Sequence, residues 1–279
     1  MAIKIITDSM CDVPKSYIEE CDILVVPLTV HFGGQIYKDG IDIKPIEFYN
    51  MLEKEAQLPK TSQVSPVEFM KVFKEELDKG NELIVINASS ALSGTHNSAL
   101  LAKNQIESQL IHVVDTQGIT LGAGTLVIKA ARLAKQGMLA EDILKEIEES
   151  KERLKHYFVL DTLKYLHKGG RISLSASVLG SILNIKPILT VESGKMVLME
   201  KSRGTKKAIF SLIEMIKENG WSLDGKVIGI NHSNAQDLAD VAEDLLRKEF
   251  NIKEVIRGEV GSVVAAYAGP GAVAFYFEV

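Results

Sequence analysis

A serine-rich segment is the most informative candidate site in this sequence: Ser89-Ser90-Ala91-Leu92-Ser93-Gly94-Thr95. It connects a predicted strand, Leu83–Asn87, to a predicted helix, Thr95–Glu107. Because the first amides of a helix have no partner within it and carry partial positive charge, they suit a carboxylate or a phosphate. Ser93 could donate its hydroxyl to such a ligand, while Gly94 would let the ligand approach the backbone. Alternatively, Ser93 or Thr95 only caps the helix, and the local sequence alone favours the cap.

Three other polar clusters could contribute to a site: Thr7-Asp8-Ser9, Asp115-Thr116 and Lys60-Thr61-Ser62-Gln63. The first two follow predicted strands, and an open α/β sheet binds its ligands at the carboxyl ends of strands. The third cluster leads into a predicted helix. Asp8 with Asp12, or Asp115 with Asp161, could form an acid–base or metal pair. Aspartates at strand ends more often accept hydrogen bonds from loop amides, and we favour that interpretation.

The motifs of common enzyme classes are absent from the sequence. It contains no Gly-x-Ser-x-Gly nucleophile elbow, no P-loop, no dinucleotide fingerprint and no HExxH zinc motif. His96 lies three residues after Ser93, so a serine-dependent lipid or acyl-ester hydrolase is one alternative function. We expect His96 instead to be a surface residue of its helix, and we predict no catalytic residue and no metal site.

A basic segment suggests a second alternative. Between Leu160 and Phe210 there are nine Lys and Arg residues against three Asp and Glu, a local charge of +6 in a chain whose net charge is −5. Within it, Lys168-Gly169-Gly170-Arg171 could bind a phosphate through its glycine amides and the guanidinium fork. The segment could therefore belong to a phosphorylated-metabolite-binding module, or it could be a solvated surface with a tight turn.

Short apolar runs alternate with amphipathic helical patterns through the first half of the chain. This rhythm predicts βαβ units and a mainly parallel sheet. The expected strands are Ile3–Ile6, Ile23–Val30, Leu83–Asn87 and Leu110–Val114, with a hairpin at His31–Lys38. The expected helices are Pro45–Ala56, Pro66–Lys79, Thr95–Glu107, Gly122–Gln136 and Ala140–Lys155.

After about residue 155 the pattern restarts, so we expect two α/β domains, 1–155 and 156–279. The expected strands of the second half are Tyr157–Leu160, Pro187–Val191, Met196–Glu200, Val227–Asn231 and Glu254–Gly258, and helical turns should reach about Leu183. Helices are expected at Thr205–Asn219 and Ala235–Phe250. The stretch Val260–Phe277 has no charged residue, but Gly269-Pro270-Gly271 would break a membrane helix. We predict a buried segment, a turn and a closing strand there, and no transmembrane segment.

The composition is that of an ordinary globular protein large enough for two domains. Hydrophobic residues make up 46% of the 279 residues, and the net charge of −5 gives no reason to expect a nucleic-acid partner. Cys11 and Cys21 are the only cysteines, so a disulfide framework is not expected. The amino terminus lacks the pattern of a signal peptide, and we therefore expect a cytoplasmic protein.

Taken in order along nearly the whole chain, these motifs resemble the DegV family of bacterial fatty-acid-binding proteins. The match rests on Thr7-Asp8-Ser9 with Asp12, Lys60-Thr61-Ser62-Gln63, Ser93-Gly94-Thr95, Val114-Asp115-Thr116, Lys168-Gly169-Gly170-Arg171-Ile172-Ser173, Lys186-Pro187-Ile188-Leu189 and Gly269-Pro270-Gly271. The sequence departs from the family pattern at Tyr267, where a histidine is usual, and at Val64, where proline is commoner.

The resemblance implies a carrier with no cofactor of its own that holds a long-chain fatty acid in an apolar tunnel between two α/β domains, with a mainly parallel N-terminal sheet and a mixed C-terminal sheet. It implies that the carboxylate is presented to a dihydroxyacetone-kinase-like fatty acid kinase, which forms an acyl phosphate for phospholipid synthesis. The implied carboxylate partners are Thr61, Ser93, Gly94, Thr95 and Tyr267. Supporting or kinase-docking roles would fall to Ser9, Ser62, Arg171 and Arg203.

Overall fold

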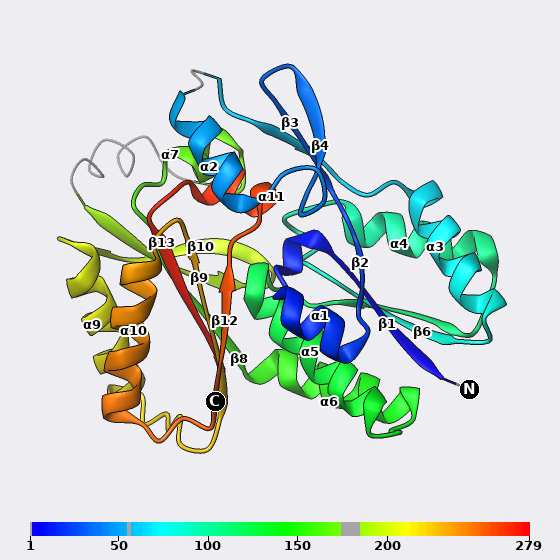
Figure 1. The fold of residues 1–279 in the computed structure, drawn as a ribbon. Helices are drawn as coiled ribbons and strands as arrows, with labels where there is room; N and C mark the ends of the chain where they lie inside the picture. The colour runs from blue at the N-terminus through cyan, green and yellow to red at the C-terminus, as the bar shows by residue number, and fades with distance from the viewer. Residues whose placement is uncertain (1, 55–56, 174–184) are drawn as a thin grey trace.

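The computed structural model describes residues 2–54, 57–173 and 185–279. Two large sheets lie side by side: a four-stranded sheet in the order β2-β1-β6-β7 and a six-stranded sheet in the order β10-β9-β8-β13-β11-β12 (Figure 1). A small antiparallel sheet, β4-β3-β5, lies above them. All strands of the first sheet are parallel, and the second sheet is mixed, which confirms the predicted α/β fold class.

The first half of the chain forms the parallel sheet and the small sheet. The strands are β1 Ile3–Asp8, β2 Leu24–Val26, β3 Thr29–Phe32, β4 Gln35–Lys38, β5 Lys60–Ser62, β6 Glu82–Asn87 and β7 Ile111–Asp115. The helices are the 3-10 turn η1 Ser9–Cys11, α1 Lys15–Cys21, α2 Pro45–Lys54, α3 Pro66–Asp78, α4 Thr95–Ile106, α5 Thr120–Lys135 and α6 Ala140–Arg153.

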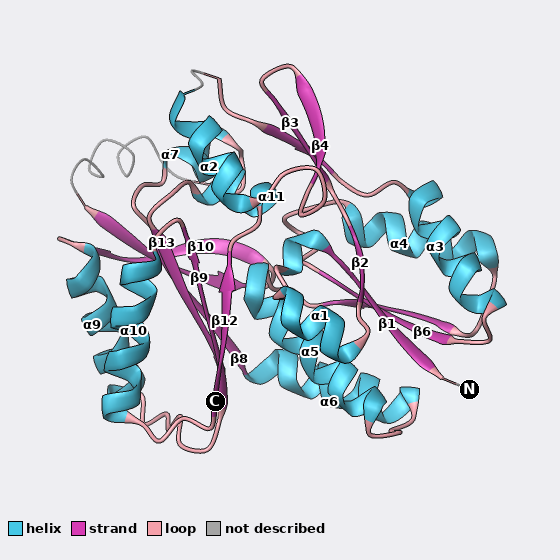
Figure 2. Ribbon diagram, viewed as in Figure 1, coloured by secondary structure: helices cyan, strands magenta, loops and turns pink. Residues whose placement is uncertain are grey.

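The second half forms the mixed sheet, whose outer face α9 and α10 cover (Figure 2). Its strands are β8 Leu154–Val159, β9 Lys186–Glu192, β10 Lys195–Ser202, β11 Val227–Ser233, β12 Glu254–Glu259 and β13 Ala272–Glu278. Its helices are α7 Lys164–Lys168, α9 Thr205–Glu218, α10 Gln236–Glu249 and α11 Ser262–Ala268. The helical turns expected up to Leu183 lie partly outside the described residues.

Helix α5 lies between the two large sheets and contacts both of them. It packs against β1 and β6 on one side and against β8, β11 and β13 on the other. Ten of its sixteen residues are buried, as expected for a helix that faces apolar surroundings nearly all round. Small residues permit this close packing: a Cβ at Gly122 would overlap the His156 ring, and a Cβ at Gly124 would overlap the backbone oxygen of Cys11.

The single strand predicted over Ile23–Val30 is wrong. Residues Leu24–Val26 form β2 in the parallel sheet, while Thr29–Phe32 form β3 in the small sheet. Pro27 stands between them, and a proline has no N–H to donate to a ladder, so the apolar run divides there. A strand over Lys60–Ser62 is not predicted by the sequence either, because its stability depends on pairing with β3, some thirty residues earlier.

The uncharged stretch Val260–Phe277 forms the buried helix α11 and strand β13, as predicted for a core segment. Among the described residues, no helix is long and apolar enough to cross a membrane. One hydrophobic core extends across both large sheets, and a second lies between the mixed sheet and helices α9 and α10. We propose that the domain boundary lies at residue 155, next to the start of β8.

Candidate ligand-binding site

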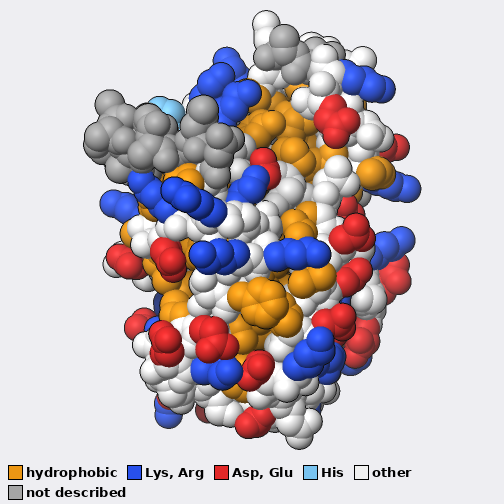
Figure 3. Space-filling view, turned by 90° about the vertical axis from the view of Figure 1, so that its left-hand side faces the viewer, with side chains coloured by type: hydrophobic (Ala, Val, Ile, Leu, Met, Phe, Trp, Pro, Cys, Tyr) orange, Lys and Arg blue, Asp and Glu red, His pale blue; other side chains and the backbone are white. Residues whose placement is uncertain are grey.

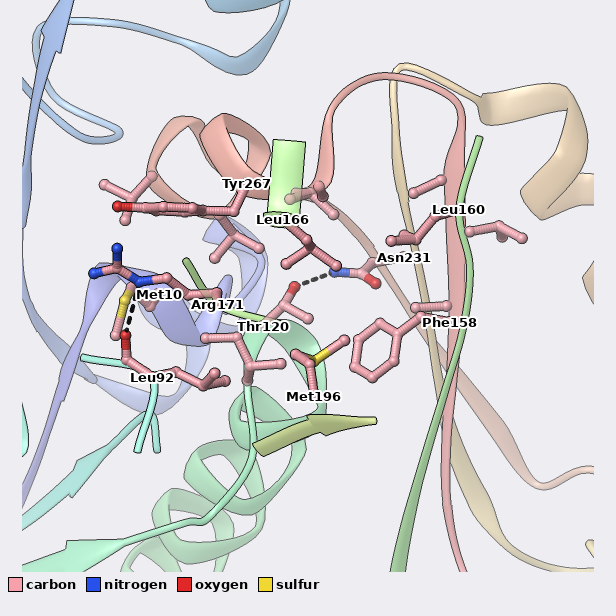
Figure 4. A pocket seen from close by; sticks show the side chains of 18 of the residues that line it. Met10, Leu92, Thr120, Phe158, Leu160, Leu166, Arg171, Met196, Asn231 and Tyr267 are labelled. Carbon is pink, nitrogen blue, oxygen red and sulfur yellow. Dashed lines mark hydrogen bonds between the residues drawn. The ribbon is translucent and has the colours of Figure 1, made fainter. Parts of the chain in front are cut away.

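A cavity lies between the two large sheets, just beyond the amino end of α5 (Figure 4). About 680 Å³ of empty space lies among its lining residues, and this volume includes open solvent at the mouth. Its wall is almost entirely aliphatic and aromatic: Met10, Leu92, Ile119, Thr120, Phe158, Leu160, Leu166, Arg171, Met196, Asn231, Val260, Val263, Val264, Tyr267, Ala268, Ala272, Val273, Ala274 and Tyr276. A concave apolar site with a few polar groups is what a small-molecule ligand requires.

At the mouth of the cavity, the wall residues Arg171 and Tyr267 meet Thr61, which is not itself part of the wall. The hydroxyls of Thr61 and Tyr267 form a hydrogen bond of 2.6 Å across 206 positions. The guanidinium carbon of Arg171 lies 4.6 Å from the centre of the Tyr267 ring, within the range of a cation–π contact. Thr61 is carried by β5, Tyr267 by α11, and Arg171 by the turn after α7, so three separate elements meet at this point.

Two glycines of the predicted motifs leave room for close side-chain contacts around this mouth. A Cβ at Gly169 would overlap the Tyr267 ring, and one at Gly94 would overlap the side chain of Gln63. Gln63 lies two residues after Thr61, so the second contact brings the start of α4 close to the strand that carries Thr61. Arg171 donates to the carbonyl oxygens of Gly169 at 2.6 Å and Leu92 at 3.4 Å.

Ser93, Gly94 and Thr95 lie at the start of α4, beside Leu92 of the cavity wall. Gly94 is the residue that caps the helix. The Ser93 hydroxyl accepts a hydrogen bond from the Thr95 amide at 3.3 Å and lies 3.0 Å from the Thr95 hydroxyl. Arg171 donates to the carbonyl oxygen of Leu92, the residue before Ser93, so the start of α4 lies close to the arginine of the cavity wall.

The other predicted residues lie elsewhere. Ser9 accepts from the Leu28 amide at 3.1 Å and borders a second, polar cleft. Ser62 is exposed and its hydroxyl lies 2.9 Å from a ring nitrogen of His31. Arg203 is exposed and follows β10, and it is not part of the cavity wall. Of the four supporting residues, the structure thus places only Arg171 at the cavity.

The aspartates at strand ends accept hydrogen bonds from loop groups, as we favoured. Asp8 accepts from the amides of Met10 at 3.0 Å and Ala88 at 3.1 Å, and burial raises the pKa of its carboxyl to about 6. Asp115 accepts from the amides of Ser90 and Gln117. Within the described part of the chain, no group of three or more acidic, histidine or cysteine side chains could hold a metal ion.

The expectation that His96 is a surface residue is wrong. Its side chain is buried, and burial lowers the pKa of its imidazole. Helix α4 turns this face toward β7, so the residue packs into the protein instead of meeting solvent. In the residues that the structure describes, the Ser93 hydroxyl is hydrogen-bonded to Thr95 and His96 Nδ1 has no partner, so the two side chains do not form the pair that a hydrolase would require.

Two polar residues of the cavity wall were not predicted from the sequence. Thr120 begins α5 and Asn231 lies in β11, and the two side chains are hydrogen-bonded to each other at 2.5 Å. A polar residue near the end of a strand is a weak signal, because it more often anchors a loop. In Figure 4 the pair lies between Arg171 and Tyr267 at one end and Phe158 at the other.

The basic segment faces the side of the molecule that carries α9. In Figure 3, lysine and arginine side chains form a band across the upper half of this face, while most acidic side chains lie lower or at its edges. Lys186 of the basic segment pairs with Asp161. The surface is suited to an acidic partner, and Arg171 of the same segment lines the cavity.

A family model described as "uncharacterised protein, DegV family" matches residues 2–279. The chain belongs to the DegV family. The DegV domain-containing protein TTE1491 of Caldanaerobacter subterraneus subsp. tengcongensis is 41% identical over 276 residues, which cover 99% of this chain and 98% of that protein. The family proposed from the sequence motifs is therefore confirmed.

Solved structures of DegV proteins have the same fold. A DegV family protein from Thermus thermophilus, described as fatty acid binding, has 32% identity and a TM-score of 0.93, with 100% of both chains covered. DegV of Bacillus subtilis, described as a fatty acid binding protein, also has 32% identity, a TM-score of 0.87 and full coverage of both chains.

Burial of His156 next to the cavity predicts a pH-dependent stability. Its ring stacks on Phe158 and meets the Tyr276 ring edge-on, and burial lowers its pKa to about 4 from an ordinary 6.5. The unfolded chain therefore binds a proton more readily, so stability should fall as the pH drops from about 6.5 to 4, by up to about 3 kcal/mol. Urea unfolding of His156→Leu should lose this pH dependence relative to the wild type. The exposed-histidine control His167→Leu should retain it, and an unchanged profile in His156→Leu would contradict the assignment.

Proposed function

We propose that this protein binds a long-chain fatty acid with its acyl chain in the cavity between the two sheets and its carboxylate at the Thr61–Tyr267 mouth. The observation that carries the proposal is an apolar cavity whose wall includes Arg171 and Tyr267, with the Thr61 hydroxyl bonded to that tyrosine. Related DegV proteins described as fatty acid binding share the fold over the full chain, which supports it. We also propose that the protein is cytoplasmic, as its free cysteines suggest.

The acyl chain would supply most of the affinity. Each buried methylene contributes about 0.8 kcal/mol, so roughly fourteen of them contribute on the order of 11 kcal/mol before ordering costs. Ala272 and Ala274 of β13 face the cavity and leave room for the chain, whereas Phe275 and Phe277 contribute to the core behind the sheet. The polar groups at the mouth then need only orient the carboxylate.

The carboxylate would replace the direct bond between Thr61 and Tyr267. Both hydroxyls can donate to one carboxylate, and a tyrosine hydroxyl is a donor without positive charge at neutral pH. The Ser93 hydroxyl and the amides of Gly94 and Thr95 would complete the site from the α4 side. Arg171, stacked on the Tyr267 ring, would supply the positive charge that the tyrosine hydroxyl lacks.

Removal of the two side-chain donors should empty the site. Protein purified natively from a bacterial host should contain about one long-chain fatty acid per chain, detected by mass spectrometry of the denatured extract. The Thr61→Ala/Ser93→Ala double variant should lose most of it, because each hydrogen bond to a charged group contributes about 1.5–3 kcal/mol.

The matched control is Ser62→Ala, because Ser62 lies on the same strand but bonds to His31 instead. This variant should keep its fatty acid. An empty extract from the wild type, together with no thermal shift when fatty acids are added, would reject the proposal.

We further propose that a separate, dihydroxyacetone-kinase-like fatty acid kinase phosphorylates the bound carboxylate. The support is that Arg171 at the mouth is exposed and belongs to the same basic segment as Arg203, which is also exposed. An acidic surface on the kinase would dock there, and Arg171 would steady the charge of the acyl phosphate.

Loss of Arg203 should weaken docking but not fatty acid binding. Arg203→Ala should lower kinase-dependent acyl phosphate formation, trapped with hydroxylamine, by about tenfold, the effect of one lost charge-assisted contact. Its fatty acid content should stay at the wild-type level. The exposed-lysine control Lys145→Ala should react normally. Equal rates for the wild type and Arg203→Ala would remove Arg203 from the docking surface.

A further inference from the structure

Among the residues described, the polar side chains of the cavity wall form two groups at different depths. Arg171 and Tyr267 lie at the mouth, and a second group, Thr120, Asn231 and Tyr276, lies deeper. The side chains of this second group are buried, with 2% or less of their surface exposed. In Figure 4, Thr120 and Asn231 lie midway along the cavity, with apolar side chains above, below and beyond them.

These buried side chains form a relay of hydrogen bonds. The Tyr276 hydroxyl donates to Asn231 Oδ1 at 3.0 Å, and Asn231 Nδ2 donates to Thr120 Oγ1 at 2.5 Å. Thr120 in turn donates its hydroxyl to the carboxyl of Asp12, which also accepts from the Gly261 amide at 2.9 Å. The relay fixes the rotamers of Thr120 and Asn231, so the two side chains present a defined polar surface to the cavity.

The relay leaves one donor and one acceptor unused. Asn231 Nδ2 has two hydrogens, and within the described part of the chain only one of them, the one directed at Thr120, has a partner. The Thr120 oxygen has two lone pairs, and among the described residues it accepts one hydrogen bond, from Asn231. A buried donor without a partner is costly in apolar surroundings, so a ligand group that satisfies it binds favourably.

The backbone at Thr120 is held in an unfavourable conformation. Its φ is +51°, in the left-handed region, where a β-branched residue is a genuine outlier. Such strain persists only when the surrounding structure maintains it, and it is commonest at functional sites. Here the consequence is that the Thr120 hydroxyl meets both Asp12 and Asn231 at the cavity wall.

We infer that the cavity has a mid-chain subsite for a hydroxyl group, and that its ligands include long-chain fatty acids hydroxylated on the acyl chain. A hydroxyl is both a donor and an acceptor, so its oxygen accepts from Asn231 Nδ2 while its hydrogen is donated to Thr120 Oγ1. An acyl chain without a hydroxyl group satisfies neither the Asn231 donor nor the Thr120 acceptor. The inference rests on the proposed function, because the subsite lies where an acyl chain would pass.

Affinity measurements on the wild-type protein, freed of bound lipid, test this inference. Isothermal titration would compare octadecanoic acid with its monohydroxylated isomers, one hydroxyl position at a time. At least one isomer should bind about three- to tenfold more tightly than octadecanoic acid, the effect of one or two net hydrogen bonds. If octadecanoic acid binds and no isomer binds more tightly, the subsite is rejected and the proposed function stands. If no acid binds at all, both are rejected.

The variant Asn231→Leu removes the donor at nearly constant volume. The preference for the best hydroxylated isomer should disappear in this variant. It should persist in Asn104→Leu, which makes the same change on the exposed surface of α4. A folded Asn231→Leu protein that keeps the preference would overturn the assignment. If Asn231→Leu fails the thermal unfolding check, the comparison of ligands on the wild type still decides.

Discussion

The packing of one helix between two sheets determines most of this structure. A helix with its side chains is roughly 10–12 Å across, so it keeps the elements on its two sides at least that far apart. Helix α5 maintains this spacing over its length and contacts both large sheets. The helix begins at Thr120, but the two sheets stay apart beyond that end. The space that a longer helix would occupy there is the cavity. The ligand site is therefore a continuation of the α5 layer.

Helix α11 closes this space from above and depends on buried carboxylates. The amides of Gly261 and Ser262, at its start, donate to Asp12 and Asp39 at 2.9 Å each. Burial raises the pKa of both carboxyls, a cost that several hydrogen bonds offset. Through these contacts the amino-terminal half of the chain holds the helix that carries Tyr267, so the wall and the mouth of the cavity are positioned together.

Sequence patterns predict the layers of this fold better than its site. The alternation of apolar runs and helical patterns predicts the parallel sheet correctly, and Pro27 shows why Ile23–Val30 had to be divided. The bond between Thr61 and Tyr267 depends on the long-range pairing of β5, so only the family resemblance suggested that they meet. The polar pair Thr120 and Asn231 was missed for a different reason. What marks it as part of a site is its hydrogen bond and the positive φ of Thr120, and residue types alone reveal neither.

Nuclear magnetic resonance of bound [1-¹³C]hexadecanoic acid tests most directly whether the acyl chain lies between the sheets. Delipidated wild-type protein should show one carboxyl resonance in slow exchange with free ligand, at one equivalent per chain. The variant Ala274→Leu would fill the cavity from β13, so it should stay folded and lose this resonance. A bound resonance of equal intensity in folded Ala274→Leu would contradict the account, because the chain would then lie elsewhere.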